Sequence, residues 1–200
     1  TGLLWYSSLS ASATPTYQNL TYAAKDTTSD GTNVYALLTN DDVVKAVSPT
    51  SKSTFISLPG ATFISYSKDF IIAGEANILY NITSGTKSKI FEHPLSTYTW
   101  IDAADGSNVI YALGGTGDHW AVHRMSIKSD GTGLDPAIVA VMLPDGEVGK
   151  SIGSYLGYIF IGTNKGVRMA QSDSNGDLTL GALLPAGGSV FCFEGQDRFV

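Results

Sequence analysis

Residues that commonly build chemical sites are scarce in this chain of 200 residues. Cysteine occurs once, at Cys192, which excludes an intrachain disulfide framework and a cysteine-rich metal site. Charged residues make up 15% of the chain, well below the roughly 25% of an average soluble domain. The formal net charge of −6 leaves no basic face that would displace phosphate counterions, so the composition speaks against nucleic-acid binding.

Long apolar runs and helical periodicity are also missing. No stretch of about 18 apolar residues occurs, so no membrane insertion is predicted, and the opening Gly2-Leu3-Leu4-Trp5-Tyr6 is too short for a signal peptide. Glycine, serine and threonine make up close to a third of the residues and interrupt the chain too often for long helices. Apolar residues are 43%, enough to form a core, and the composition therefore predicts an ordered all-β fold.

Four short, almost wholly apolar runs are bounded by turn residues, and each is predicted to be a strand buried on both faces. The runs are residues 34–38, 70–73, 109–113 and 158–161. The turn signals before them are Asp30-Gly31-Thr32-Asn33, Ser67-Lys68-Asp69, Asp105-Gly106-Ser107-Asn108 and Leu156-Gly157.

These elements repeat along the chain. The turn Asp30-Gly31-Thr32-Asn33-Val34 recurs almost letter for letter at residues 105–109, and an X-Pro step closes successive apolar runs. The X-Pro steps are Leu58-Pro59, His93-Pro94, Leu143-Pro144 and Leu184-Pro185. A period of roughly 40–45 residues with four short strands is typical of a β-propeller blade. A β-sandwich also has regular turns, but it does not predict these recurrences.

The predicted blades are residues 17–59, 60–94, 95–144 and 145–185, and a partial fifth blade spans residues 186–200. Residues 3–9 are predicted to be the outer strand of a preceding blade or a closing strand. About four and a half blades are therefore visible. Because the fifth blade stops inside a strand, the chain is expected to be an incomplete propeller, a piece of a longer polypeptide.

The histidines are His93, His119 and His123. His119 and His123 lie on one face of a predicted strand, about 13 Å apart at ~3.3 Å per residue. That separation is too large for one zinc ion, so both are predicted to be surface residues.

The segment Asp173-Ser174-Asn175-Gly176-Asp177 has oxygen-bearing side chains at alternating positions, as a calcium loop has. Its glycine is misplaced for an EF-hand, and no glutamate stands at the twelfth position. It also resembles, loosely, the Asp-box turn of sialidase-type propellers. An ordinary hairpin turn is the favoured interpretation, and calcium binding by the segment stays open.

Arginine occurs three times, at Arg124, Arg168 and Arg198, and sialidases bind a carboxylate with three arginines. Arg124 and Arg168 stand in matching His-Arg-Met and Val-Arg-Met contexts of successive blades, and Lys45 lies at a similar place in the first blade. The pattern predicts a repeated solvent-facing or between-blade position rather than a converging site.

Other features fit turns or packing. Asp41-Asp42 is predicted to be a hairpin tip, and no nucleophile elbow, P-loop or dinucleotide fingerprint is present. Asn19-Leu20-Thr21 and Asn81-Ile82-Thr83 fit the glycosylation pattern. Tyr98, Trp100 and Trp120 are placed at blade ends, where exposed aromatics suit carbohydrate or protein contact. No catalytic residue, cofactor site or metal site is predicted, and the binding residues are left unassigned.

The fourth blade carries a family resemblance. Its Gly153-Ser154-Tyr155-Leu156-Gly157 start, the turn Ile161-Gly162-Thr163-Asn164-Lys165-Gly166 and the polar hairpin ending in Leu180-Gly181 resemble the propeller region of minor tail proteins from phages of actinobacteria. The resemblance covers roughly 35 residues directly, and the blade pattern extends it loosely over the rest.

The resemblance implies a structural component of a phage tail tip or tail fibre, located in the virion. Its implied partners are other tail-tip subunits or copies of itself, and also a glycan or protein of the host envelope. It implies no catalytic residues, so the chain is predicted not to be an enzyme. The alternative is a carbohydrate-active propeller, either a lectin-like binder or a sialidase-like hydrolase. The loops between blades are mostly small, and only Pro144-Asp145-Gly146-Glu147 carries acids, which favours the structural role.

Overall fold

The structure is a computed structural model that describes residues 2–5 and 16–193. In these ranges the chain forms four four-stranded antiparallel sheets and one two-stranded sheet. No helix that could cross a membrane is found there. The all-β prediction is therefore confirmed.

Each four-stranded sheet is a meander in which consecutive strands pair. The first sheet contains β3 (Ala24–Ser29), β4 (Val34–Leu38), β5 (Asp42–Ser48) and β6 (Ser51–Ser57). The second contains β7 (Ala61–Ser67), β8 (Phe70–Glu75), β9 (Ile78–Asn81) and β10 (Ser88–Glu92). The third contains β11 (Thr99–Asp105), β12 (Val109–Thr116), β13 (His119–Ser126) and β14 (Ile138–Met142). The fourth contains β15 (Gly149–Tyr155), β16 (Tyr158–Thr163), β17 (Gly166–Ser172) and β18 (Leu178–Pro185). These sheets are called blades 1 to 4.

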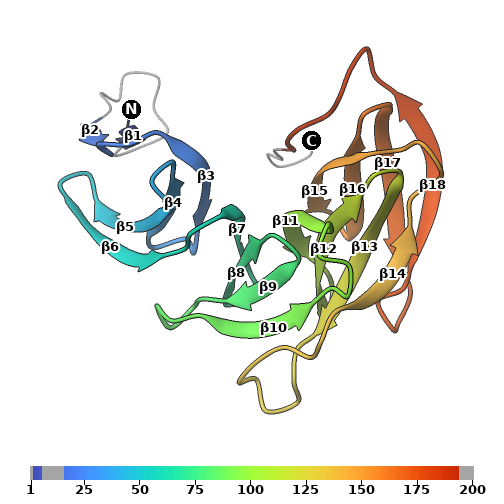
Figure 1. Ribbon diagram of the computed structural model, residues 1–200, viewed down its shortest axis with the longest axis horizontal. Helices are drawn as coiled ribbons and strands as arrows, with labels where there is room; N and C mark the ends of the chain where they lie inside the picture. The colour runs from blue at the N-terminus through green and yellow to red at the C-terminus, as the bar shows by residue number, and fades with distance from the viewer. Residues whose placement is uncertain (1, 6–15, 194–200) are drawn as a thin grey trace.

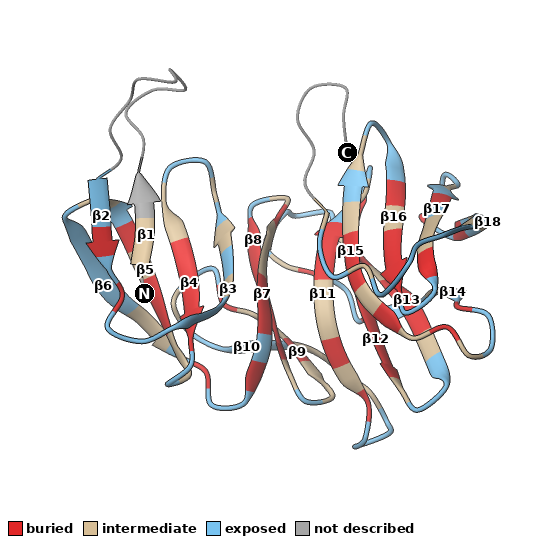
Figure 2. Cartoon of the chain, turned by 90° about the horizontal axis from the view of Figure 1, so that it is seen from above, coloured by how far each residue is buried: buried red, intermediate tan, exposed pale blue. Residues whose placement is uncertain are grey.

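The four predicted apolar runs are the second strands of the four blades, β4, β8, β12 and β16. Their residues are mostly buried, whereas the last strands β6, β10, β14 and β18 are mostly exposed (Figure 2). Burial of both faces of a strand explains why these runs read as continuous apolar segments rather than as alternating ones.

The blades follow one another in an arc, with their first strands β3, β7, β11 and β15 side by side (Figures 1 and 2). The core is divided into layers between neighbouring blades. Tyr35 and Ile71 belong to the layer between blades 1 and 2, Phe63 and Trp100 to the next, and Leu113 to the layer between blades 3 and 4. Each blade therefore depends on its neighbours for the burial of its apolar faces.

The first strand of every blade carries a register shift at the same place. The residue after each shift is Asp26, Phe63, Asp102 or Ser151. This shared β-bulge aligns the blades residue by residue, and that alignment decides which side chains are equivalent.

The ends of the chain differ from the predicted blade boundaries. Tyr17 pairs with Leu4 in the two-stranded sheet of β1 (Gly2–Trp5) and β2 (Thr16–Asn19), and blade 1 begins at Ala24. The chain turns between β2 and β3 because Thr21 adopts a positive φ and its N–H binds the Asn19 side chain. Of the predicted segment 3–9, residues 6–9 lie outside the described residues.

The predicted fifth blade begins at Ala186, but residues 186–193 contain no strand. They are held as irregular chain by Val190, whose N–H donates to Thr163 O and whose carbonyl accepts the Ser151 hydroxyl. The remainder of that predicted blade, residues 194–200, lies outside the described residues.

Candidate functional site

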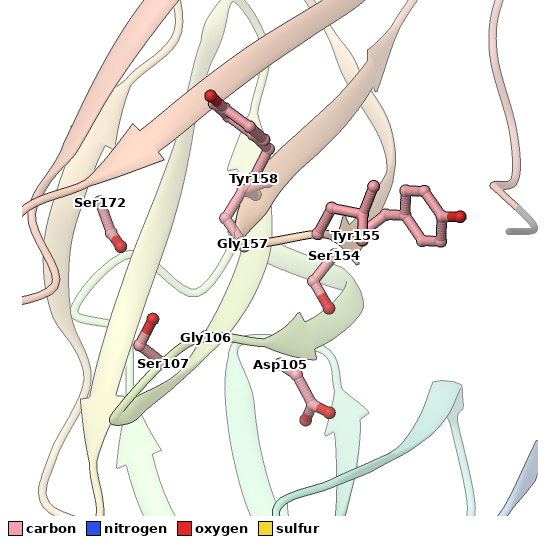
Figure 3. A pocket seen from close by; sticks show the side chains of 10 residues that line it. Asp105, Gly106, Ser107, Ser154, Tyr155, Gly157, Tyr158 and Ser172 are labelled. Atoms are coloured by element: carbon pink, nitrogen blue, oxygen red, sulfur yellow. The ribbon is translucent and has the colours of Figure 1, made fainter. Parts of the chain in front are cut away.

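A pocket opens between blades 3 and 4, at the end of the strands where β11 turns into β12 and β15 turns into β16 (Figure 3). It has a volume of 330 Å³ and is lined by Asp105, Ser107, Ser154, Tyr158 and Ser172, among others. Figure 3 shows the side chains of Ser107 and Ser172 turned toward one another and the Tyr155 ring directed away from that of Tyr158.

A second pocket, of 290 Å³, shares Ser107 and Ser172 with the first and continues past Asn108 to Asp173 and Ser174. The two pockets together are called the interblade groove. Their volumes lie in or near the range of about 300–1,000 Å³ that is common for small-molecule sites.

The walls of the groove are tied together. The Tyr111 hydroxyl of blade 3 donates to the Gly176 carbonyl of blade 4 at 2.9 Å, and Arg124 Nε donates to Asp177 Oδ1 at 2.9 Å. Gly106 makes the β11–β12 turn possible, because a Cβ there would lie 2.6 Å from the Tyr111 ring. The groove is therefore a fixed feature of the contact between the two blades.

One side of the groove ends in an unusual turn. Leu156 and Gly157 both have positive φ, and the Leu156 side chain is 72% exposed. A two-residue hairpin with positive φ at both positions favours Asn-Gly, and a leucine there is strained. In blade 2 the equivalent positive-φ positions are the polar residues Lys68 and Asp69. Burial does not explain a leucine at this position.

Replacing Leu156 with asparagine is expected to raise the free energy of unfolding by about 1 kcal/mol, because asparagine accepts the left-handed conformation. Urea unfolding of the 200-residue chain measures the change. Leu156→Ala is the matched control, since it shortens the side chain and keeps the strain, so its gain should be smaller. A loss of stability in Leu156→Asn would show that the leucine side chain holds the turn in place.

Among residues 2–5 and 16–193, no lysine, arginine or histidine lines either pocket of the groove. Asp105 and Asp173 supply its carboxylates. The groove is therefore suited to neutral or cationic groups and unsuited to phosphate, sulfate or carboxylate ligands.

The segment 173–177 is the turn between β17 and β18, so its interpretation as a hairpin is confirmed. Asp173 Oδ1 accepts the N–H groups of Asn175 and Asp177 at 2.8 and 2.9 Å, and Asp177 binds Arg124. Within residues 2–5 and 16–193 no group of three metal-ligating side chains is found. The oxygens that suggested a calcium loop thus stabilise the turn and bind the neighbouring blade.

Arg124 and Arg168 bind different carboxylates. Arg124 joins blade 3 to Asp177 of blade 4, as the prediction of a between-blade position expects. Arg168 forms two bonds to Glu147 in the loop that leads into blade 4, Nε to Oε2 at 2.7 Å and Nη2 to Oε1 at 2.6 Å. Arg198 lies outside the described residues.

The predicted equivalence of Arg124 and Arg168 is wrong by one residue. The shared bulge aligns Tyr35 with Tyr111, and their partners on the third strand are Lys45 and Arg124. The residue at that position of blade 4 is Met169, not Arg168. A shift of one residue along a strand moves a side chain to the other face, which is why Arg168 binds Glu147. Lys45 lies over the Tyr35 ring, 5.7 Å from its centroid.

The prediction that His123 is a surface residue is also wrong, whereas His119 is exposed. His123 is 3% exposed, and its ring lies 4.9 Å from that of Trp100, between centroids. Burial lowers the pKa of His123 to about 4, and the neighbouring His93 adds to this effect. The imidazole is therefore neutral at pH 7 and forms part of the aromatic core.

Two of the three aromatics placed at blade ends are core residues instead. Trp100 is fully buried, and Tyr98 stacks on His93 with 3.8 Å between ring centroids. Trp120 is half-buried, and its Nε1 donates to the Gly117 carbonyl at 2.8 Å. These rings pack the molecule and are not free for a ligand.

Sequence reasoning missed a pair of half-buried aspartates in equivalent positions of blades 1 and 3. Asp26 accepts the Ile64 N–H of blade 2, and Asp102 accepts the Ile152 N–H of blade 4, both at 2.9 Å. Each therefore joins its first strand to that of the next blade. The signal for them is their position after the bulge, which only the strand pairing reveals.

Burial raises the pKa of both aspartates. Burial raises the pKa of Asp102 to about 7, and the charge of Asp26 adds to it, although the N–H groups of Ile152 and Ala103 oppose the rise. Burial likewise raises the pKa of Asp26. Neither aspartate lines the interblade groove.

The remaining candidates are structural as well. Asp41 and Asp42 lie at the β4–β5 hairpin, where Asp41 pairs with Lys25. Glu147, from the acid-bearing loop between blades, is buried against Arg168. Of the two glycosylation patterns, Asn81 lies at the end of β9, and its side chain accepts the Thr83 N–H.

Comparisons with known proteins identify the fold. No family model and no curated protein matches the chain. Among solved structures, the extracellular domain of the putative hybrid two-component system BT4673 from B. thetaiotaomicron is similar, with a TM-score of 0.59 and 12% identity over 87% of this chain and 25% of that one.

Two further similar structures are YCF48 bound to D1 peptide (TM-score 0.53, 15% identity, 86% of this chain and 57% of that one) and BamB from Moraxella catarrhalis (TM-score 0.51, 9% identity, 84% and 52%). The chain spans a little over half the length of YCF48 and BamB. Both are β-propellers, so the predicted propeller fold is confirmed. Identities this low establish the fold alone.

Proposed function

We propose that this chain is a structural component of a phage tail tip or tail fibre and contributes to attachment to the host surface. The observation that carries the proposal is that the charged groups most suited to chemistry are engaged in holding blades together or in fixing a loop to its blade. Arg124 pairs with Asp177, Arg168 with Glu147, and Asp26 and Asp102 bind backbone of the next blade. Such a chain suits a rigid assembly part, and the resemblance of blade 4 to tail proteins supplies the setting.

The test is to locate the chain in particles. We expect immunogold labelling, with antibodies against the 200-residue chain, to mark the tail tip of the purified phage that encodes it. Peptide mass mapping of the same particles should recover residues 1–200. Particles that lack these peptides, while the infected lysate contains them, would overturn the virion assignment.

The second candidate is a carbohydrate-active propeller. Its hydrolase form requires arginines that converge on one carboxylate, whereas Arg124 and Arg168 each have a separate partner. Its lectin-like form is favoured by the interblade groove, which offers a tyrosine beside hydroxyl, amide and carboxylate groups. Saccharide binding is also one way in which a tail protein attaches to a host.

A further inference from the structure

The turn sequence Asp-Gly-(Thr/Ser)-Asn makes different contacts in blades 1 and 3. In blade 1 the Asp30 carboxylate accepts the N–H groups of Thr32 and Asn33, the Asn33 side chain and the Tyr35 hydroxyl. Burial alone would raise the pKa of Asp30, but these hydrogen bonds lower it to about 2. This aspartate is fully engaged in its own turn.

In blade 3 the same turn sequence is shifted by one residue relative to the strands that flank it. Asp30 N–H bonds the Asn33 carbonyl, whereas Gly106 N–H bonds the Val109 carbonyl, so Asp105 stands one position earlier and ends β11. Within the described chain, the side chains of Asp105, Ser107 and Asn108 make no hydrogen bond. All three line the interblade groove and are exposed to solvent.

An apolar edge stands beside these polar groups. Tyr158 is 39% exposed, and the strained Leu156 is 72% exposed. An energetically costly residue that adds nothing to packing marks a place where function outweighs stability. A groove with unengaged hydroxyl, amide and carboxylate groups on one side and an aromatic ring on the other matches a polyol that has both hydroxyls and apolar C–H faces.

We propose that the interblade groove binds a neutral saccharide, with the Tyr158 ring and Leu156 against the sugar's C–H face. Asp105, Ser107 and Asn108 bind its hydroxyls. Among the described residues, no lysine, arginine or histidine lines either pocket, and Arg124 beside Gly176 is already paired with Asp177. This directs the choice to neutral sugars, because an acidic sugar would meet the carboxylates of Asp105 and Asp173. The inference rests on the attachment part of the proposed function, not on the location in a virion.

The test uses saturation-transfer NMR and titration calorimetry of the 200-residue chain with four probes: maltotetraose, mannotetraose, a β-1,4-galactotetraose and, as the acidic probe, tetragalacturonate. We expect at least one neutral tetrasaccharide to bind, and tetragalacturonate to bind at least tenfold more weakly. Tyr158→Ala should weaken the binding of the neutral probe at least tenfold. Asp105→Asn should weaken it at least threefold.

Leu156→Asn separates binding from folding, because the variant is expected to be more stable than the parent and still to bind at least threefold more weakly. The matched controls are Tyr22→Ala, a tyrosine that is 48% exposed away from the groove, and Asp118→Asn, in the turn at the opposite end of β12 and β13. Both should bind as the parent does.

Failure of all three neutral probes to bind, stronger binding of tetragalacturonate, or equal losses in Tyr158→Ala and Tyr22→Ala would each overturn the saccharide site. None of these results bears on the location in the particle. Conversely, particles that lack the chain would overturn the virion assignment and leave the saccharide site standing.

Discussion

Replacing Arg168 with methionine is expected to lower the free energy of unfolding by about 3–5 kcal/mol, because it leaves Glu147 buried without its partner. The Glu147 side chain is 4% exposed, and that of Arg168 is 15% exposed. The guanidinium binds both carboxylate oxygens and also donates from Nη1 to the Gly181 carbonyl at 2.8 Å. Urea unfolding at pH 7, followed by tryptophan fluorescence, measures the loss.

The chain offers a matched control in Arg124→Met. Its partner Asp177 has a side chain that is 50% exposed, and water replaces the guanidinium there, so the expected loss is about 0–1 kcal/mol. The double variant Arg168→Met/Glu147→Leu should recover most of the stability, since it removes the unpaired charge together with its partner. Similar losses in the two single arginine variants would contradict the structural distinction between the pairs.

The blade repeat was accessible from sequence because strand burial and turn chemistry act locally. The second strands β8 and β12 read as short apolar runs since neighbouring blades cover both of their faces, and β4 is covered by blade 2 on one face and by Leu3 and Leu20 on the other. The turn at Asp30 is likewise a local structure, held by hydrogen bonds among residues 30–35. Features of this kind need no knowledge of which blade lies beside which.

The differences between equivalent side chains in different blades depend instead on the register of the strands. When the blades are aligned by the bulge of their first strands, Arg168 lies one residue away from the position of Arg124 on the third strand. Asp105 likewise lies one residue away from the position of Asp30 in the turn between the first and second strands. In a strand, one residue exchanges the two faces, so identical letters acquire different partners. The spacing of residues in the sequence does not reveal that offset. The offset is what leaves the polar side chains of the interblade groove unengaged.

The burial of polar side chains was the other feature that the sequence did not reveal. The half-buried Asp102 and the buried His123 carry no local sign of their surroundings, because the groups that cover them come from other strands and blades. The pKa values of both groups are therefore shifted, and the two shifts change the free energy of unfolding with pH in opposite directions. These two groups make the pH dependence of folding a direct test of the contacts between blades.

The sense of each effect follows from proton binding. Unfolded Asp102 loses its proton near pH 4 and the folded group near pH 7, so the free energy of unfolding falls as pH rises between these values, by a total of about 4 kcal/mol. The pKa of His123 is about 6.5 unfolded and about 4 folded. Its contribution therefore rises with pH between about 4 and 6.5, and the two groups partly cancel.

Asp102→Asn is expected to remove one of the two opposing contributions and so reveal its size. The asparagine Oδ1 still accepts the Ile152 N–H, while the ionisation of the side chain is removed. The difference in the free energy of unfolding between variant and parent should move in favour of the variant by up to about 4 kcal/mol from pH 4 to pH 8. Urea unfolding at unit pH intervals measures this difference, and its change with pH is independent of any constant cost of the substitution.

Asp30→Asn is the control, because hydrogen bonds lower the pKa of Asp30 to about 2 and its contribution changes only below pH 4. Its difference from the parent should stay constant from pH 4 to pH 8. His123→Phe should act in the opposite direction to Asp102→Asn, since it removes the contribution that rises between pH 4 and 6.5. If the difference for Asp102→Asn is as flat as that for Asp30→Asn, Asp102 is ionised and solvated in the folded chain, and blades 3 and 4 are not joined through its half-buried carboxyl group.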